Sequence, residues 1–161
     1  MLREQLNADL RDAMRAGDET RKTTLRLLLT AVRNAEIPPE QDASTSGAAA
    51  PQRQELDDAA VLEIVRREVK QRRDSIDAYR KANRADLVAK EEAEVGVLAV
   101  YLPAQMSRDE IEQAARRVIE QVGARGPADK GKVMPVLIRE LGDRAEGREI
   151  NAVVTELLSQ S

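Results

Sequence analysis

The 161-residue chain contains no cysteine, histidine, tryptophan or phenylalanine, and its only aromatic residues are Tyr79 and Tyr101. Because there is no imidazole and no thiol, histidine-based triads, cysteine nucleophiles, cysteine–histidine zinc sites and disulfides are all excluded. The scarcity of aromatic rings also excludes the base-stacking platforms with which RNA-recognition sheets hold unpaired bases. The chain therefore has little ordinary catalytic equipment, and its function must be sought in other patterns.

A secretory signal peptide and a long apolar span are also missing from the sequence, which predicts a cytoplasmic location without membrane contact. The composition is 42% hydrophobic and 34% charged, with a formal net charge of -3. These values fit one domain, or two small ones, of a water-soluble protein with a modest core.

The first 37 residues show apolar side chains at helical spacing and predict a helical hairpin. Gly17 is expected to end the first helix in the left-handed conformation, and Asp18 to cap the second, which runs to about Ile37. The second helix is expected to turn five residues towards the core: Leu25, Leu28, Leu29, Val32 and Ala35.

Residues 38–54 read PPEQDASTSGAAAPQRQ and have no apolar period. Such a stretch of alanine, serine, proline and polar residues has nothing to bury, which predicts a mobile surface loop.

A long helix is predicted over residues 55–83, with a seam formed by Leu62, Val65, Val69, Ile76 and Tyr79. Arg72 interrupts that seam. Either its stem reaches out to the solvent, or a carboxylate from another helix meets its guanidinium, and we favour the pairing.

A fourth helix is predicted down to Leu102, just before Pro103. The acids at Glu91, Glu92 and Glu94 are interpreted as a charged, solvated face of this helix.

After Pro103, Ser107 and Glu110 form the capping box that starts a new helix, which Gly123 ends. Two further apolar segments follow, at residues 133–141 and after Gly147. The sequence thus predicts an all-α fold: an N-terminal four-helix unit with a long central helix over residues 1–102, and a small three-helix tail over 103–161.

Four blocks of sequence then carry a family resemblance: AGDETRKTTLRLLLTAVRNAEI at 16–37, the stretch from EVKQRRDSIDAYRK to VLAVYLP at 68–103, DKGKVM at 129–134, and RAEGREIN at 144–151. In this order they resemble the GatB/YqeY family over nearly the whole chain outside the loop. Two features depart from the family pattern: the loop is longer, and Pro135 stands where a small residue is usual.

The resemblance implies a helical protein whose tail is similar to the tRNA-contacting tail of the B subunit of the glutamine-dependent aspartyl/glutamyl-tRNA amidotransferase. It implies tRNA as a partner, together with amidotransferase subunits or an aminoacyl-tRNA synthetase. The family label is that of a carbon–nitrogen ligase with glutamine as amido-N-donor. The sequence shows no phosphate loop, no nucleophile elbow and no paired-serine amidase motif, so we expect no catalytic residue, cofactor or metal in this chain, and intrinsic catalysis stays open.

Candidate RNA-binding residues follow from the positive charges of the tail, because phosphates are bound by lysine and arginine whatever the overall charge. Nearby glycines would let a backbone approach a phosphate closely. The alternative is that these glycines cap short helices and that the charges solvate a small unit. The candidates, called the tail basic cluster below, are Arg125, Lys130, Lys132, Arg139, Arg144 and Arg148.

A secondary basic cluster occurs at residues 66–73, where Arg66, Lys70 and Arg73 share one helical face. Salt bridges to the acids of the following helix are the favoured interpretation, and an RNA or protein surface is the other. The alternative function of the chain is accordingly a non-catalytic protein–protein interaction module.

Overall fold

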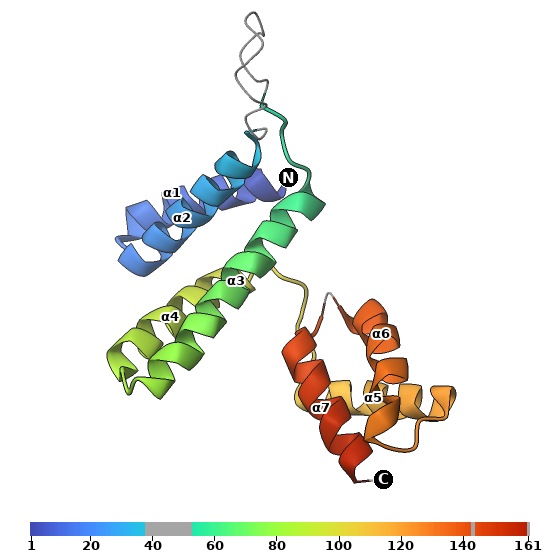
Figure 1. Cartoon of the computed structure of the whole chain (residues 1–161). Helices are drawn as coiled ribbons and strands as arrows, with labels where there is room; N and C mark the ends of the chain where they lie inside the picture. Colours follow the sequence, from blue (N-terminus) through green and yellow to red (C-terminus); the bar gives the residue numbers. More distant parts are fainter. Residues whose placement is uncertain (38–52, 143, 161) are drawn as a thin grey trace, which may run out of the picture. The chain divides into compact units, whose positions relative to one another are not determined.

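The computed structural model describes residues 1–37, 53–142 and 144–160 (Figure 1). Within these residues the chain forms seven α-helices, one short 3-10 helix and no strand, which confirms the all-α prediction. The helices are α1 (Leu2–Ala16), α2 (Glu19–Ala35), α3 (Asp58–Lys81), α4 (Ala85–Ala99), α5 (Arg108–Val122), η1 (Pro127–Asp129), α6 (Lys130–Leu141) and α7 (Gly147–Ser159). They belong to two compact units, Met1–Leu102 and Pro103–Ser161.

Two helical hairpins, α1–α2 and α3–α4, make up the N-terminal unit (Figure 1). Gly17 adopts φ 69° and closes α1, while the side chain of Asp18 accepts a hydrogen bond from the amide of Arg21, as the sequence predicts. Asn83, also left-handed at φ 55°, makes the turn between α3 and α4. The buried core is shared by all four helices: Leu6, Leu25, Leu28, Leu29, Val32, Val61, Ile64, Val65, Val69 and Leu98.

The start of α3 and the identity of some core residues differ from the sequence prediction. The helix α3 starts at Asp58 rather than residue 55, because Asp57 caps it by accepting the amide of Ala60. Val61 and Ile64 enter the core in place of the half-buried Leu62, and Ala35 is exposed at the end of α2. The predicted loop at 38–54 falls mainly on residues 38–52, which lie outside the described residues.

Tyr101, just after α4, joins that helix to the α1–α2 hairpin. Its hydroxyl donates to Oδ2 of Asp9 in α1 at 2.5 Å, and the other oxygen of Asp9 lies 3.6 Å from a guanidinium nitrogen of Arg21 in α2. Burial of the phenol and the adjacent Asp9 carboxylate both raise the pKa of Tyr101 above its usual range.

This raised pKa predicts a loss of stability in alkali that depends on Tyr101. The protonated phenol is favoured in the folded chain, so its contribution is present below about pH 10, the ordinary tyrosine value, and is lost as the pH rises further. We expect Tyr101→Phe to cost about 1 kcal/mol at pH 7. Urea unfolding followed by circular dichroism at pH 7 and pH 11 should show this difference shrinking, and a constant difference would contradict the assignment.

The tail forms a three-helix unit with its own core. Its start has the predicted capping box, since the Ser107 hydroxyl accepts from the Glu110 amide and the Glu110 carboxylate accepts from the Ser107 amide. Gly123 closes α5 at φ 69°. Pro135 lies inside α6, beyond its first turn, where it removes one helical amide donor. The buried core comprises Ile111, Ala114, Ala115, Val118, Val133, Leu137, Leu141, Ala145, Ile150, Val153, Val154, Leu157 and Leu158.

Candidate nucleic-acid interface

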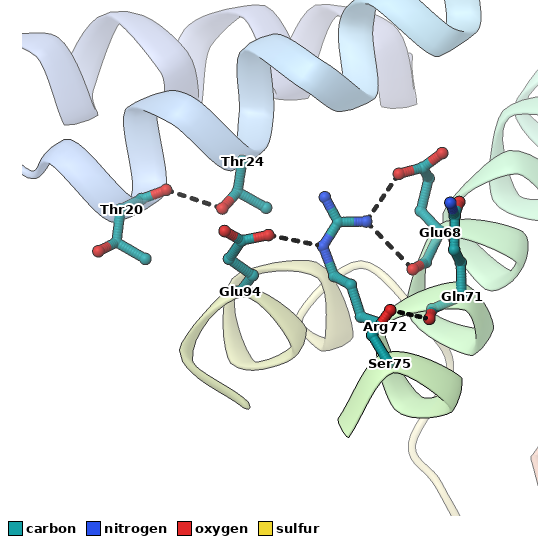
Figure 2. Close-up of polar contacts among 7 residues, drawn as sticks. All are labelled: Thr20, Thr24, Glu68, Gln71, Arg72, Ser75 and Glu94. Carbon is teal, nitrogen blue, oxygen red and sulfur yellow. Dashed lines mark hydrogen bonds and ion pairs between the residues drawn. The ribbon is translucent and has the colours of Figure 1, made fainter. Parts of the chain in front are cut away.

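The buried arginine of the long helix forms an ion-pair network between α3 and α4 (Figure 2). Nε of Arg72 donates to Oε2 of Glu94 in α4 at 2.9 Å, and Nη1 donates to Oε2 of Glu68 in α3 at 2.7 Å. The side chains of Arg72 and Glu94 are 9% and 11% exposed. The predicted pairing of Arg72 with a carboxylate from another helix is therefore confirmed.

Burial of the Arg72 guanidinium by itself lowers its pKa, but the hydrogen bonds to Glu68 and Glu94 outweigh that effect and raise the pKa above its ordinary value. The interpretation of Glu94 as part of a solvated face is wrong, because this carboxylate is buried against Arg72. Its neighbour Glu92 is exposed, as expected, and pairs with Arg80 of α3 at 2.7 Å. The pattern of one helix does not reveal that an acid on the next helix will meet its arginine.

The members of the secondary basic cluster lie along α3 outside this network. Arg66 pairs with Glu63 of its own helix and makes a further polar interaction. Arg73 is half-buried and engaged in further polar interactions, while Lys70 is exposed. Two of the three cations of this cluster, Arg66 and Arg73, therefore already interact with other groups of the protein.

In the tail basic cluster, Arg125 and Lys132 meet at one carboxylate. Asp129, at the end of η1, accepts the amide of Arg125 at 2.9 Å on Oδ2 and lies 2.9 Å from Nζ of Lys132 through Oδ1. These contacts, the Arg125 amide first, lower the pKa of Asp129, so the carboxylate stays charged. The loop before α6 is thereby held against the first turn of the helix.

Lys132 and Arg139 share one exposed face of α6, because residues seven positions apart lie on the same side of a helix. Lys130, two positions before Lys132, is half-buried and points about 200° away around the helix axis. Arg125 and Lys132 thus lie at Asp129, Arg139 follows Lys132 two turns along the same face, and Lys130 lies on another side of α6.

The remaining two members lie beyond the C-terminal end of α6. Arg144 is exposed, and its backbone is fixed: its amide donates to the Leu141 carbonyl at 2.7 Å, and its carbonyl accepts from the Met106 amide at 2.8 Å. Arg148 is exposed in the first turn of α7 and makes polar interactions. The backbone of Arg144 is therefore fixed between the end of α6 and the start of α5, and its positive charge acts on the Glu110 carboxylate of α5.

Sequence reasoning missed a further set of cations, on the α1–α2 hairpin: Arg11, Arg26 and Arg33 are all exposed. They are scattered along the sequence among acids, so no compact motif marks them. Only the packing of two helices reveals that they share a side.

In the described part of the chain, no group of three or more acidic side chains is arranged to hold a metal ion. Among the same residues, no helix combines the length and apolar character needed to cross a membrane.

Comparison with known proteins shows the family to which the chain belongs. Residues 3–158, almost the entire chain, match the family described as "Yqey-like protein". The chain belongs to the Yqey-like protein family. The predicted resemblance is thereby confirmed for the YqeY fold itself, and the relation to tRNA and to the amidotransferase is not part of this match.

Three fungal relatives share the Yqey-like sequence, and each is named "Altered inheritance of mitochondria protein 41, mitochondrial". The protein of Lachancea thermotolerans is 40% identical over 60% of this chain and 46% of its own length. That of Eremothecium gossypii is 38% identical over 69% and 54%, and that of Saccharomyces cerevisiae 29% identical over 82% and 66%. The chain therefore spans about half the length of the first two relatives.

These names contradict the predicted cytoplasmic location, because the relatives are mitochondrial proteins by name. The prediction rested on a missing signal peptide and a missing apolar span. Neither absence distinguishes one aqueous compartment from another, so the physical basis of that prediction was insufficient.

Proposed function

We propose that this Yqey-like protein binds tRNA through the tail basic cluster and acts as an accessory to proteins that process tRNA. The observation that carries the proposal is the exposure of four cations on and around α6: Lys132 and Arg139 on one face, Arg125 at Asp129 before the helix, and Arg144 after it. Such a group suits the phosphate backbone, which is bound by lysine, arginine and backbone amides. The tail contains no aromatic residue, so we propose recognition of backbone and shape rather than of stacked bases.

The resemblance to the amidotransferase B-subunit tail supports tRNA rather than another nucleic acid. In this proposal the chemistry of glutamine-dependent amide transfer lies on partner proteins, and this chain contributes binding. Asp129 partly neutralises Lys132, and the charge of Arg144 acts on Glu110, so Arg139 is expected to contribute most per residue.

The double variant Arg139→Glu, Arg144→Glu tests the proposal. We expect it to weaken binding of fluorescently labelled total tRNA, measured by anisotropy at 50 mM NaCl, by about tenfold or more, because two phosphate contacts become repulsive. The matched control is Arg108→Glu, Arg116→Glu, which changes the charge equally at two exposed tail residues that are paired with Glu156 and Glu112. Equal affinity of the two double variants would count against the tail basic cluster.

A further inference from the structure

The outer side of the α1–α2 hairpin presents Arg11 of α1 together with Arg26 and Arg33 of α2, here called the hairpin basic face. All three side chains are exposed. Among the ion pairs of the described residues, none engages these three arginines, although other arginines of the hairpin, such as Arg3, Arg15 and Arg21, do form pairs.

The three arginines share one side of the hairpin. In α2, Arg26, Thr30 and Arg33 follow one another at spacings of four and three, which places them in one row. Nη2 of Arg26 lies 3.9 Å from the sulfur of Met14, so this row continues onto α1. Arg11 precedes Met14 by three residues and therefore lies next to it on the same side of α1.

This row faces away from α4. The opposite edge of the hairpin carries Asp9 and Arg21, which meet each other and Tyr101 at the end of α4. Two exposed acids share this side: Glu4, seven residues before Arg11, and Glu19, seven residues before Arg26. Glu19 is paired with Lys22, so the three arginines outnumber the one remaining acid and the row keeps a net positive charge.

We propose that the hairpin basic face binds the phosphate backbone of RNA, as a second contact surface for the RNA held by the tail. This inference rests on the proposed function for the identity of the ligand. Arg26 and Arg33 are about 10.5 Å apart along the helix axis, a span over which separate phosphates can be contacted.

An acidic protein fits this face less well than RNA does. Protein interfaces are centred on apolar and aromatic side chains, with the charged groups at the rim. Here the hairpin has no aromatic residue. Its exposed apolar side chains, Met14 and Leu27 at 51% and Ile37 at 47%, alternate with the three arginines instead of forming one apolar centre. A polyanion held by guanidinium groups matches that composition.

The test uses the full-length chain and labelled total tRNA, with anisotropy titrations at several NaCl concentrations. We expect Arg26→Glu, Arg33→Glu to weaken binding about tenfold at 50 mM salt. When NaCl is raised from 50 to 200 mM, the wild type should lose affinity by a factor about ten times larger than this variant does, because the variant has about two fewer phosphate contacts. The matched control, Arg80→Glu, Arg84→Glu, carries the same charge change at exposed arginines paired with Glu92 and Asp86 and should retain the wild-type salt dependence.

The outcomes separate this inference from the proposed function. If only Arg139→Glu, Arg144→Glu weakens binding, while the hairpin variant behaves like its control, the hairpin basic face is refuted and the tail function stands. If only the hairpin variant weakens binding, the tail function is refuted and the hairpin basic face stands as an RNA-binding surface. Absence of tRNA binding by the wild type overturns both proposals. Arg26→Gln, Arg33→Gln, which removes charge without adding repulsion, repeats the test if the glutamate variant proves poorly folded by circular dichroism.

Discussion

Replacing Arg72 with methionine is expected to lower the free energy of unfolding of the N-terminal unit by about 3–5 kcal/mol. The substitution keeps the length of the stem but removes the guanidinium that neutralises Glu68 and Glu94, whose side chains are 19% and 11% exposed. A carboxylate left buried without a partner must either stay charged at low dielectric or take up a proton, and both are costly.

Tyrosine fluorescence during urea unfolding measures this loss specifically, because Tyr79 and Tyr101 both lie in the N-terminal unit and are the only aromatic residues of the chain. Arg67→Met, at an exposed position of the same helix, is the control and should cost under about 0.5 kcal/mol. Replacing the whole network, Arg72→Met with Glu68→Met and Glu94→Leu, should restore most of the stability. A cost below about 1 kcal/mol for Arg72→Met alone would show that the pair behaves like an exposed one.

Leu137→Ala is expected to destabilise the tail by about 2–5 kcal/mol while leaving the N-terminal unit intact. Leu137 is fully buried in α6, among core residues from α5 and α7. Truncation removes apolar contacts and leaves a cavity. A unit of this size has little stability in reserve, so much of its helix should be lost under mild conditions.

Two probes separate the units in this experiment. The circular dichroism of Leu137→Ala should show an early transition at low urea, whereas the tyrosine fluorescence midpoint should stay that of the wild type. Ile138→Ala is the control in the adjacent position, since that side chain is 48% exposed, and it should cost under about 1 kcal/mol. Coincident shifts of both probes would mean that the two units unfold as one.

Features that depend on a few neighbouring residues could be predicted from the sequence. Gly17 and Gly123 adopt the left-handed conformation expected after an apolar stripe, and Ser107 with Glu110 forms the expected capping box. The pairing of Arg72 was also predictable, because a cation in an apolar seam requires a partner. These inferences rest on local geometry or on a strong desolvation cost.

Features that depend on packing between helices could not be predicted in the same way. The burial of Glu94 follows from its position opposite Arg72 in α3, which a helical wheel of α4 does not contain. The same holds for the hairpin basic face, since Arg11 and Arg26 are brought to one side only by the antiparallel packing of α1 and α2. In the tail, Lys130 and Lys132 look equivalent in sequence but point to different sides of α6.

The most direct test of the account is the affinity of the full-length wild-type chain for labelled total tRNA, measured by anisotropy from 50 to 300 mM NaCl. We expect a dissociation constant in the micromolar range, and a plot of log affinity against log salt concentration with a slope of about -3 or steeper, as four or more phosphate contacts require. No binding at 50 mM NaCl, or an affinity that does not change with salt, would contradict the proposed binding of RNA by these cations.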